Sequence, residues 1–228
     1  MAKNNRTAVI LTLLIILGLF SLAGAVVWFG LKTQPNNGLP SIPGFSSSSA
    51  SSNNPSPSQD DRTQPLNQLP LESDRNVNYS KLRDDLQQQN WKAADRETYE
   101  RLPEAAGSKA QAQGFTPQDE MDTFSCKDLR TVDRLWNNAS NGKFGFAAQQ
   151  GILRALGDYR KMYDQVGWQK SSGEWEIEWT YNPQTKRMDY KPGKEPNFTT
   201  PPPGHFPTVE RGYNFDVSLD AALKRCKF

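Results

Sequence analysis

The side chains that carry chemistry do not form a recognisable catalytic centre. The chain of 228 residues has one histidine, His205, and it contains no Gly-x-Ser-x-Gly sequence, no P-loop and no GxGxxG stretch. A nucleophile needs a neighbouring base, and neither Cys126 nor Cys226 has a local catalytic partner. The acidic pairs Asp84-Asp85 and Asp119-Glu120 are adjacent in sequence, so on a helix their side chains point in different directions. These patterns argue against an enzyme.

The two cysteines also fail to predict a metal site. There is no CxxC sequence and no cysteine–histidine cluster, whereas a structural zinc site needs three or four closely arranged ligands. In an oxidising compartment Cys126 and Cys226 could form a disulfide, and their separation in sequence neither favours nor forbids it. The alternative is two small, buried, hydrophobic side chains, and this is the state that we expect.

Aromatic and basic side chains are concentrated in the C-terminal half of the chain. Aromatic rings can cover the faces of a wide, flat, apolar molecule, while cations hold its carboxylates. The side chains that could do so are Phe144, Phe146, Trp168, Trp175, Trp179, Tyr181 and Phe198, with Lys186, Arg187 and Arg211 nearby. Six tryptophans in a domain of this size are also typical of a hydrophobic core, so composition alone does not identify a ligand.

The elements that must position these side chains are mostly helical. Leu129, Val132 and Trp136 recur at i, i+3 and i+7, which predicts a helix with one buried face. Periodicity and capping residues predict helices over residues 80–89, 91–102, 126–138, 146–156 and 159–166. No alternation of strands with helices and no repeat is visible. We therefore expect an all-α domain with a long C-terminal loop region.

One segment of that loop region shows a different period. Trp175, Ile177, Trp179 and Tyr181 alternate with polar residues, as in a half-exposed strand, and a turn over 182–185 predicts a short β-hairpin. A two-stranded hairpin is marginally stable alone, so it needs support. Its aromatic face could pack on the helices or form a mobile flap over a ligand.

The N-terminal region has the length and polarity of a membrane anchor. The run from residue 8 to 31 is apolar and uncharged, and at 1.5 Å per residue it is long enough to cross a ~30 Å hydrocarbon layer. Lys3 and Arg6 precede it, which favours a cytoplasmic N-terminus and a domain on the far side of the membrane. A cleaved signal peptide is the alternative, because Ala23-Gly24-Ala25 has the form of a processing site.

The chain is therefore expected to have three parts. Residues 1–32 are a single-pass membrane anchor, residues 33–70 a disordered linker rich in Ser, Asn and Pro, and residues 71–228 a helical domain. The formal net charge is +2, and no basic block interleaved with aromatic residues occurs. Nucleic acid is therefore not an expected partner.

Three stretches of the helical domain together resemble one known family. They are YSKLRDDLQQQNWKAADRETYERL at 79–102, DLRTVDRLWNNASNGKFGFAAQ at 128–149 and PPPGHFP at 201–207. The domain is similar, over about residues 78–226, to the genomes-uncoupled-four family of tetrapyrrole-binding regulators of magnesium chelatase. The resemblance implies a non-catalytic protein that binds protoporphyrin IX or Mg-protoporphyrin IX and contacts the large subunit of the chelatase.

The resemblance also implies where the ligand lies. In the family it occupies a cupped surface formed largely by the loop after the Phe-Gly-Phe helix, here about residues 168–207. The aromatic side chains named above, Arg187 and His205 would then contact the tetrapyrrole. His205 could ligate a central metal, or it could anchor the loop through hydrogen bonds, and we expect the second role.

Two functions follow as hypotheses. The first is a membrane-tethered tetrapyrrole-binding protein that regulates or supplies magnesium chelatase. The second is a pigment-free structural or sensory module that contacts another protein at the membrane. Chelatase chemistry needs ATP and is cytoplasmic or stromal, whereas the charge bias of the anchor places this domain on the far side. Topology therefore helps to separate the two hypotheses.

Overall fold

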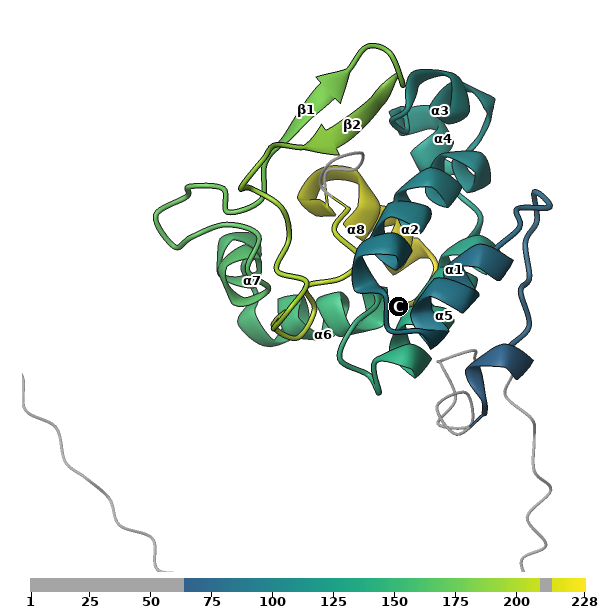
Figure 1. Ribbon diagram of the computed structural model, residues 1–228, viewed down its shortest axis with the longest axis horizontal. Coiled ribbons are helices and arrows are strands. Elements are labelled where there is room, and N and C mark those ends of the chain that lie inside the picture. The colour runs from purple at the N-terminus through teal and green to yellow at the C-terminus, as the bar shows by residue number, and fades with distance from the viewer. Residues whose placement is uncertain (1–63, 210–214) are drawn as a thin grey trace, which may run out of the picture. The chain divides into compact units, whose positions relative to one another are not determined.

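The computed structural model describes residues 64–209 and 215–228 (Figure 1). Its helices are α1 (Ser80–Gln87), α2 (Trp91–Ala106), α3 (Ser108–Gln113), α4 (Gln118–Asp122), α5 (Cys126–Ala139), α6 (Phe146–Leu156), α7 (Tyr159–Gln165) and α8 (Asp220–Arg225). A 3-10 helix, η2 (Leu66–Gln68), precedes them, and a π-helical turn, η3 (Phe215–Leu219), leads into α8. The prediction of a mostly helical domain with a short hairpin is confirmed.

Helix α5 lies at the centre of the hydrophobic core. Leu129, Val132 and Trp136 are fully buried, as their spacing predicts. The Trp136 ring stacks on Phe206 with centroids 5.6 Å apart, and its Nε1 donates a hydrogen bond of 2.9 Å to Thr98 Oγ1 on α2. The buried face of α5 thus joins the α1–α2 pair to the C-terminal loop region.

Helix α2 is longer than the sequence predicts. Its predicted end at Leu102 is wrong, because the helix continues through Pro103 to Ala106. Proline lacks the N–H that would bond to the preceding turn, and this loss usually ends a helix. Here Leu102, Ala105 and Ala106 are buried in the core, so packing of the last turn offsets the missing hydrogen bond.

A buried carboxylate of α5 begins helix α6. The Asp133 carboxylate is buried and its Oδ1 accepts a 2.8 Å hydrogen bond from the N–H of Ala147 in the first turn of α6. Gly145 precedes the helix with φ of 111°, and a Cβ there would lie 2.7 Å from Asp133 Oδ1. Burial raises the pKa of Asp133 to about 7, although the backbone N–H groups of Phe146 and Ala147 favour the charged form.

Replacement of Asp133 by asparagine should remove a pH dependence of stability. Because the folded-state pKa lies above the ordinary 3.8, the native state holds a proton that the unfolded chain releases. This group therefore contributes stability below pH 4 that is lost as pH rises towards 7, about 2 kcal/mol of it between pH 5 and pH 7. Urea denaturation of both proteins at pH 5, 6 and 7 measures this. The free energy of unfolding of Asp133→Asn minus that of the unmutated chain should increase from pH 5 to pH 7. A difference that does not change with pH would contradict the raised pKa of Asp133.

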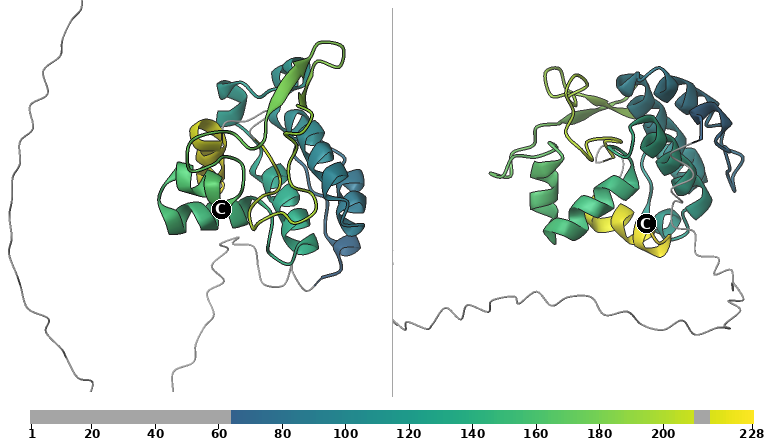
Figure 2. Two further views of the ribbon diagram at one scale, coloured as in Figure 1. Left: turned by 60° about the vertical axis from the view of Figure 1, so that its left-hand side comes forward. Right: turned by 90° about the horizontal axis from the view of Figure 1, so that it is seen from below.

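The hairpin consists of β1 (Trp179–Asn182) and β2 (Arg187–Tyr190) in antiparallel register, with Tyr181 opposite Met188. Residues 175–178, expected to belong to the first strand, pair elsewhere. The N–H groups of Glu176 and Ile177 both donate to the carbonyl of Trp168, so this segment turns back onto the loop after α7. Figure 2 shows the hairpin in two further views.

Hydrogen bonds from buried side chains fix the hairpin to helix α2. The hydroxyl of Tyr190 donates to Asp95 Oδ2 over 2.7 Å, and Asp95 Oδ1 accepts the N–H of Thr208 over 2.7 Å. The N–H of Met188 donates to the hydroxyl of Tyr99 over 3.0 Å. Strand β2 therefore has a defined position on the helical body.

Seven residues assigned to the predicted linker belong to the folded part. Leu69 is buried, and Asn138 Nδ2 of α5 donates a hydrogen bond of 2.9 Å to the carbonyl of Gln64. The predicted boundary at residue 70 therefore lies inside the fold. None of the helices in the described ranges is long and apolar enough to cross a membrane. The anchor expected over residues 1–32, and residues 33–63 of the linker, lie outside those ranges.

The two cysteines form a disulfide. Cys126, the first residue of α5, is bonded to Cys226 at the end of α8, with their Cα atoms 5.3 Å apart. The expectation of two free, buried thiols is therefore wrong. That expectation rested on the usual role of cysteine as a small buried hydrophobic residue. Sequence separation neither favoured nor forbade the pairing, because it does not show which segments the fold brings together. The Cys226 carbonyl also accepts a hydrogen bond of 2.7 Å from Arg130, so backbone and side chain are both held there.

Candidate functional site

A hollow of about 360 Å³ lies between the hairpin and the end of α3. It is lined by Ala112, Gln113, Gly114, Phe115, Tyr181, Lys186, Arg187 and Met188, and we call it the hairpin hollow. In Figure 1 the hairpin stands beside α3 and α4. The two walls meet closely, because a Cβ on Gly114 (φ 76°) would lie 2.6 Å from the carbonyl oxygen of Lys186.

The apolar part of the hairpin hollow is uncovered. Phe115 and Tyr181, 51% and 53% exposed, are the large hydrophobic side chains that the described ranges leave exposed. They come from opposite walls, Phe115 from the segment after α3 and Tyr181 from β1. Two exposed aromatic rings in one hollow offer stacking surface to a flat apolar molecule.

The same hollow carries two cations. Lys186 is exposed and lies in the hairpin turn with φ of 54°, and it has no ion pair with any residue that the structure describes. Arg187 is half-buried, and its Nε lies 3.2 Å from Glu100 Oε2 of α2. The Glu100 contact orients the guanidinium at the wall. A carboxylate that enters the hollow therefore meets one free ammonium and one fixed guanidinium.

Four of the predicted ligand-binding side chains belong to the interior instead. Phe144, Phe146, Trp168 and His205 are at most 2% exposed. Trp168 Nε1 donates a 2.8 Å hydrogen bond to the carbonyl of His205, which holds two of these segments together. These side chains shape the helical body and the loop rather than offering a surface at the hairpin hollow.

His205 is held by hydrogen bonds at both ring nitrogens. Nδ1 donates to the carbonyl of Val166 over 2.6 Å, and Nε2 accepts the N–H of Asn197 over 3.1 Å. Burial lowers the pKa of His205, and the Val166 carbonyl opposes this by favouring the protonated ring. The neutral imidazole therefore anchors the loop and has no nitrogen left to ligate a metal.

Trp175, Trp179 and Phe198 are half-buried and pack on their neighbours. The ring of Trp175 lies 5.6 Å from Tyr163 of α7 and 5.9 Å from Trp179, centroid to centroid. Phe198 stacks on Phe206 at 5.5 Å. The segment before the hairpin thus packs on α7, while Tyr181 nearer the tip stays open. The predicted packing of the aromatic face on the helices is therefore seen for Trp175. Its role as a flap over a ligand stays a prediction.

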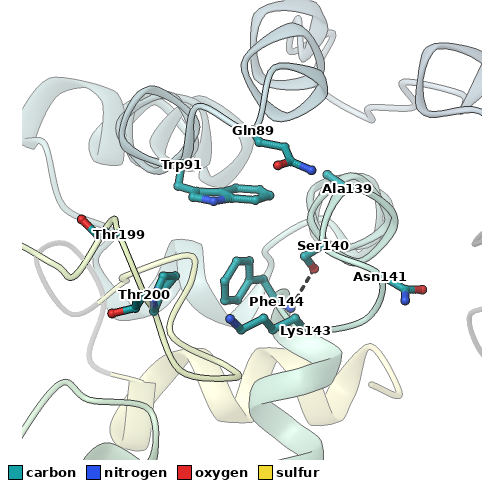
Figure 3. Close-up of a pocket in the computed structure, with 10 residues that line it drawn as sticks. Gln89, Trp91, Ala139, Ser140, Asn141, Lys143, Phe144, Thr199 and Thr200 are labelled. Carbon is teal, nitrogen blue, oxygen red and sulfur yellow. Dashed lines mark hydrogen bonds between the residues drawn. The ribbon is translucent and has the colours of Figure 1, made fainter.

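A second hollow, of about 480 Å³, lies near the start of α2 (Figure 3). Its lining is Gln89, Trp91, Ala139, Ser140, Asn141, Lys143, Phe144, Thr199, Thr200 and Pro201, and we call it the Trp91 hollow. The Trp91 and Phe144 rings meet edge to face at 5.3 Å, and Lys143 Nζ lies 5.2 Å from the Phe144 centroid. Its aromatic rings largely contact each other, so it offers a flat ligand less open ring surface than the hairpin hollow.

The structure therefore brings together part of the predicted set. Tyr181, Lys186 and Arg187 share the hairpin hollow, whereas Arg211 lies outside the described ranges. Sequence reasoning missed Phe115 and Met188. Phe115 follows Gly114 in an aperiodic stretch, and its isolation from any hydrophobic pattern is the one signal that could have marked it.

The lining of the hairpin hollow supplies aromatic surface and positive charge. Across residues 64–209 and 215–228, no three histidine, cysteine, aspartate or glutamate side chains are grouped so that they could hold a metal ion. The hairpin hollow offers two aromatic rings, a thioether and two cations, with no nucleophile beside a base. Such a lining suits a flat ligand with apolar faces and acidic substituents.

Comparison with known proteins agrees with the fold and the motifs. The GUN4-like family matches residues 72–217. A Ycf53-like protein of Synechocystis is 34% identical over 115 residues, which cover 50% of this chain and 49% of that protein. The chloroplastic tetrapyrrole-binding protein of Arabidopsis thaliana is 34% identical over 90 residues, which cover 39% of this chain and 34% of that protein. The chain thus spans about half or less of the length of these relatives.

A solved structure gives the same fold. GUN4 from Chlamydomonas reinhardtii superposes with a TM-score of 0.53 and 25% identity, over 70% of this chain and 95% of that one. The family match covers more than half of this chain and includes α1 to α7, the hairpin and the Gly-His-Phe-Pro stretch at 204–207. The chain therefore belongs to the GUN4-like family.

Proposed function

We propose that this protein binds a tetrapyrrole in the hairpin hollow and, loaded with it, regulates or supplies magnesium chelatase. The observation that carries the proposal is the pair of exposed rings, Phe115 and Tyr181, beside two cations. Membership of the GUN4-like family and the name of the Arabidopsis thaliana relative support it. Protoporphyrin IX and Mg-protoporphyrin IX are the ligands that we propose.

Binding would be non-catalytic and would use the faces and edge of the macrocycle. Phe115 and Tyr181 would take one apolar face out of water, and Lys186 and Arg187 would hold the propionates. The volume of about 360 Å³ is in the usual range of small-molecule sites. Because both nitrogens of His205 are occupied, we expect no axial histidine to select between the metal-free and magnesium forms.

The proposal also includes a membrane tether. The uncharged run over residues 8–31 supports it, and the side of the membrane on which the domain lies decides whether the chelatase is within reach. Protease protection of the domain in sealed vesicles measures that side directly. A domain on the face opposite the chelatase would favour the pigment-free module at the membrane as the function.

Neutralising the two cations should weaken acidic porphyrins selectively. We expect Lys186→Gln/Arg187→Gln to weaken protoporphyrin IX binding about tenfold and to leave its dimethyl ester almost unchanged, because only free propionates gain from the cations. Absorbance titration of the full chain with each porphyrin measures both affinities. The matched control is Lys170→Gln, an exposed lysine that does not line the hollow.

The comparison of acid and ester separates the outcomes. Equal losses for both porphyrins would remove Lys186 and Arg187 from the carboxylate contacts and would place the macrocycle elsewhere. No binding of either porphyrin by the unmutated chain would contradict the proposed function and favour the pigment-free module.

A further inference from the structure

We propose that the Cys126–Cys226 disulfide is a reversible redox site, opened by a dithiol reductant, that controls the α3–α4 wall of the hairpin hollow. Its effect on binding rests on the proposed function. The disulfide closes a loop of about 100 residues, because its cysteines are 100 positions apart. A covalent link across so long a loop constrains the unfolded chain strongly, so its state matters for stability.

The surroundings of Cys126 stabilise a thiolate there. Cys126 is the first residue of α5, a helix of 14 residues, so its sulfur lies at the positive end of the helix dipole. Arg225 Nη1 lies 3.6 Å from Cys126 Sγ. The nearest acid in sequence, Asp128, is already engaged, since it accepts hydrogen bonds from the Tyr79 hydroxyl and the Asp74 N–H. A helix N-terminus and a guanidinium are the features that make a cysteine redox-active.

The two cysteine residues differ in exposure, and this difference sets the order of the exchange. Cys126 is half-buried, whereas Cys226 is 1% exposed. A thiolate of the reductant therefore attacks Cys126 Sγ, the protein S–S bond breaks, and Cys226 leaves as a thiolate that takes a proton from water. The reductant and Cys126 are now joined in a mixed disulfide. The second thiolate of the reductant attacks the reductant sulfur of that bond and expels the Cys126 thiolate. The reductant ends as a disulfide, and the protein gains two electrons.

The geometry favours the second step of this exchange. The group expelled is the Cys126 thiolate, and a stabilised thiolate leaves faster. Its stabilisation by Arg225 and by the helix N-terminus also favours the reduced pair at equilibrium. The same half-buried sulfur is thus the point of attack and the better leaving group.

A chain of contacts connects this disulfide to the hairpin hollow. Beside Cys226, Arg225 Nη2 donates to the carbonyls of Met121 and Phe124, over 3.4 and 2.9 Å, at the end of α4. Glu120 of α4 accepts the N–H groups that begin α3, those of Lys109 (3.0 Å) and Ala110 (2.8 Å).

These hydrogen bonds join α3 to α4 and, through Arg225, join α4 to the C-terminal helix. Residues 112–115, at the end of α3 and just after it, form one wall of the hollow. Reduction removes the covalent link between the end of α8 and α5 and leaves the hydrogen bond of Arg130 to the Cys226 carbonyl there. The hold of Arg225 on α4 is then weaker. A wall that is less well ordered must be ordered on binding, which costs affinity.

The first test asks whether the pair is oxidised and how easily it opens. The full chain, purified without reductant, should take up no maleimide, and two after dithiothreitol. In a series of glutathione redox buffers, Arg225→Gln should require at least threefold more reducing conditions for half-reduction than the unmutated chain. Arg225→Lys, which keeps the charge, should stay closer to it. Two labels before reduction, or equal midpoints for all three proteins, would overturn the redox site.

The second test measures the effect of reduction on the hollow. Reduction should lower the melting temperature by about 10 °C or more and weaken protoporphyrin IX binding at least threefold. The variant Cys126→Ser/Cys226→Ser should behave like the reduced chain and should not respond to dithiothreitol. Equal affinities of the oxidised and reduced chains would overturn the control of the hollow.

A readout without porphyrin separates this inference from the proposed function. Limited proteolysis should cut residues 107–123 faster in the reduced chain than in the oxidised one. If the oxidised chain binds no porphyrin, the proposed function fails, and faster cutting still supports the redox control of the wall. Equal cutting rates would overturn that control whatever the porphyrin result.

Discussion

Trp136→Ala is expected to reduce the free energy of unfolding by about 3–5 kcal/mol, the largest stability change predicted for a single substitution in this protein. Trp136 is fully buried, so alanine leaves a cavity between α2 and the C-terminal loop. The substitution removes the stack on Phe206 and leaves Thr98 Oγ1 without the Nε1 donor of Trp136. Urea denaturation at one pH, with circular dichroism as the signal, measures the change.

Two variants control for this measurement. Trp136→Phe keeps most of the ring volume but loses the N–H, so its loss should be well below that of alanine. Tyr181→Ala removes a side chain that is 53% exposed and should change stability by less than about 0.5 kcal/mol. A loss below about 1 kcal/mol for Trp136→Ala would mean that the core does not depend on this face of α5.

The sequence predicts the helical elements well where hydrophobic period and capping residue agree. In α5 the period of Leu129, Val132 and Trp136 is joined by Ser125, whose Oγ accepts the N–H of Asp128. The prediction of the helix end fails at Pro103. Proline normally ends a helix, but burial of the last turn of α2 stabilises the helix beyond it. Such tertiary effects depend on partners that are distant in sequence.

The candidate site is only partly predictable for a related reason. Alternation along the strand predicts that Tyr181 lies on the aromatic face, but it does not say where packing on α7 ends and the open tip begins. Tryptophan and histidine are common in ligand sites, but Trp168 and His205 are both buried here. Each donates a side-chain hydrogen bond to a backbone carbonyl. Composition cannot distinguish the inside of a domain from its surface. The Cys126–Cys226 pairing likewise depends on the path of the whole chain.

Removal of both exposed rings is expected to weaken protoporphyrin IX binding by about 100-fold, or about 2.7 kcal/mol. Phe115 and Tyr181 come from opposite walls of the hairpin hollow, so one macrocycle placed between them contacts both. Each single alanine variant should weaken protoporphyrin IX binding about tenfold. The factor for Phe115→Ala/Tyr181→Ala should be roughly the product of the two single factors. The free energy of unfolding should stay nearly constant, because both side chains are about half exposed in the free protein. Absorbance titration of the full chain and its variants gives the affinities.

Thr180 of β1 provides a control for the two ring variants, and Trp91 of the second hollow tests the alternative position of the porphyrin. Thr180 precedes Tyr181 on β1 and is exposed, and successive strand residues point to opposite faces, so Thr180→Ala should bind porphyrin normally. If Phe115→Ala/Tyr181→Ala binds as tightly as the unmutated chain while Trp91→Ala loses affinity, the macrocycle lies in the Trp91 hollow. Lys143 would then be the cation that contacts its carboxylates, because it lines that hollow beside Phe144. The choice between the two hollows thus depends on which aromatic rings a bound porphyrin removes from water.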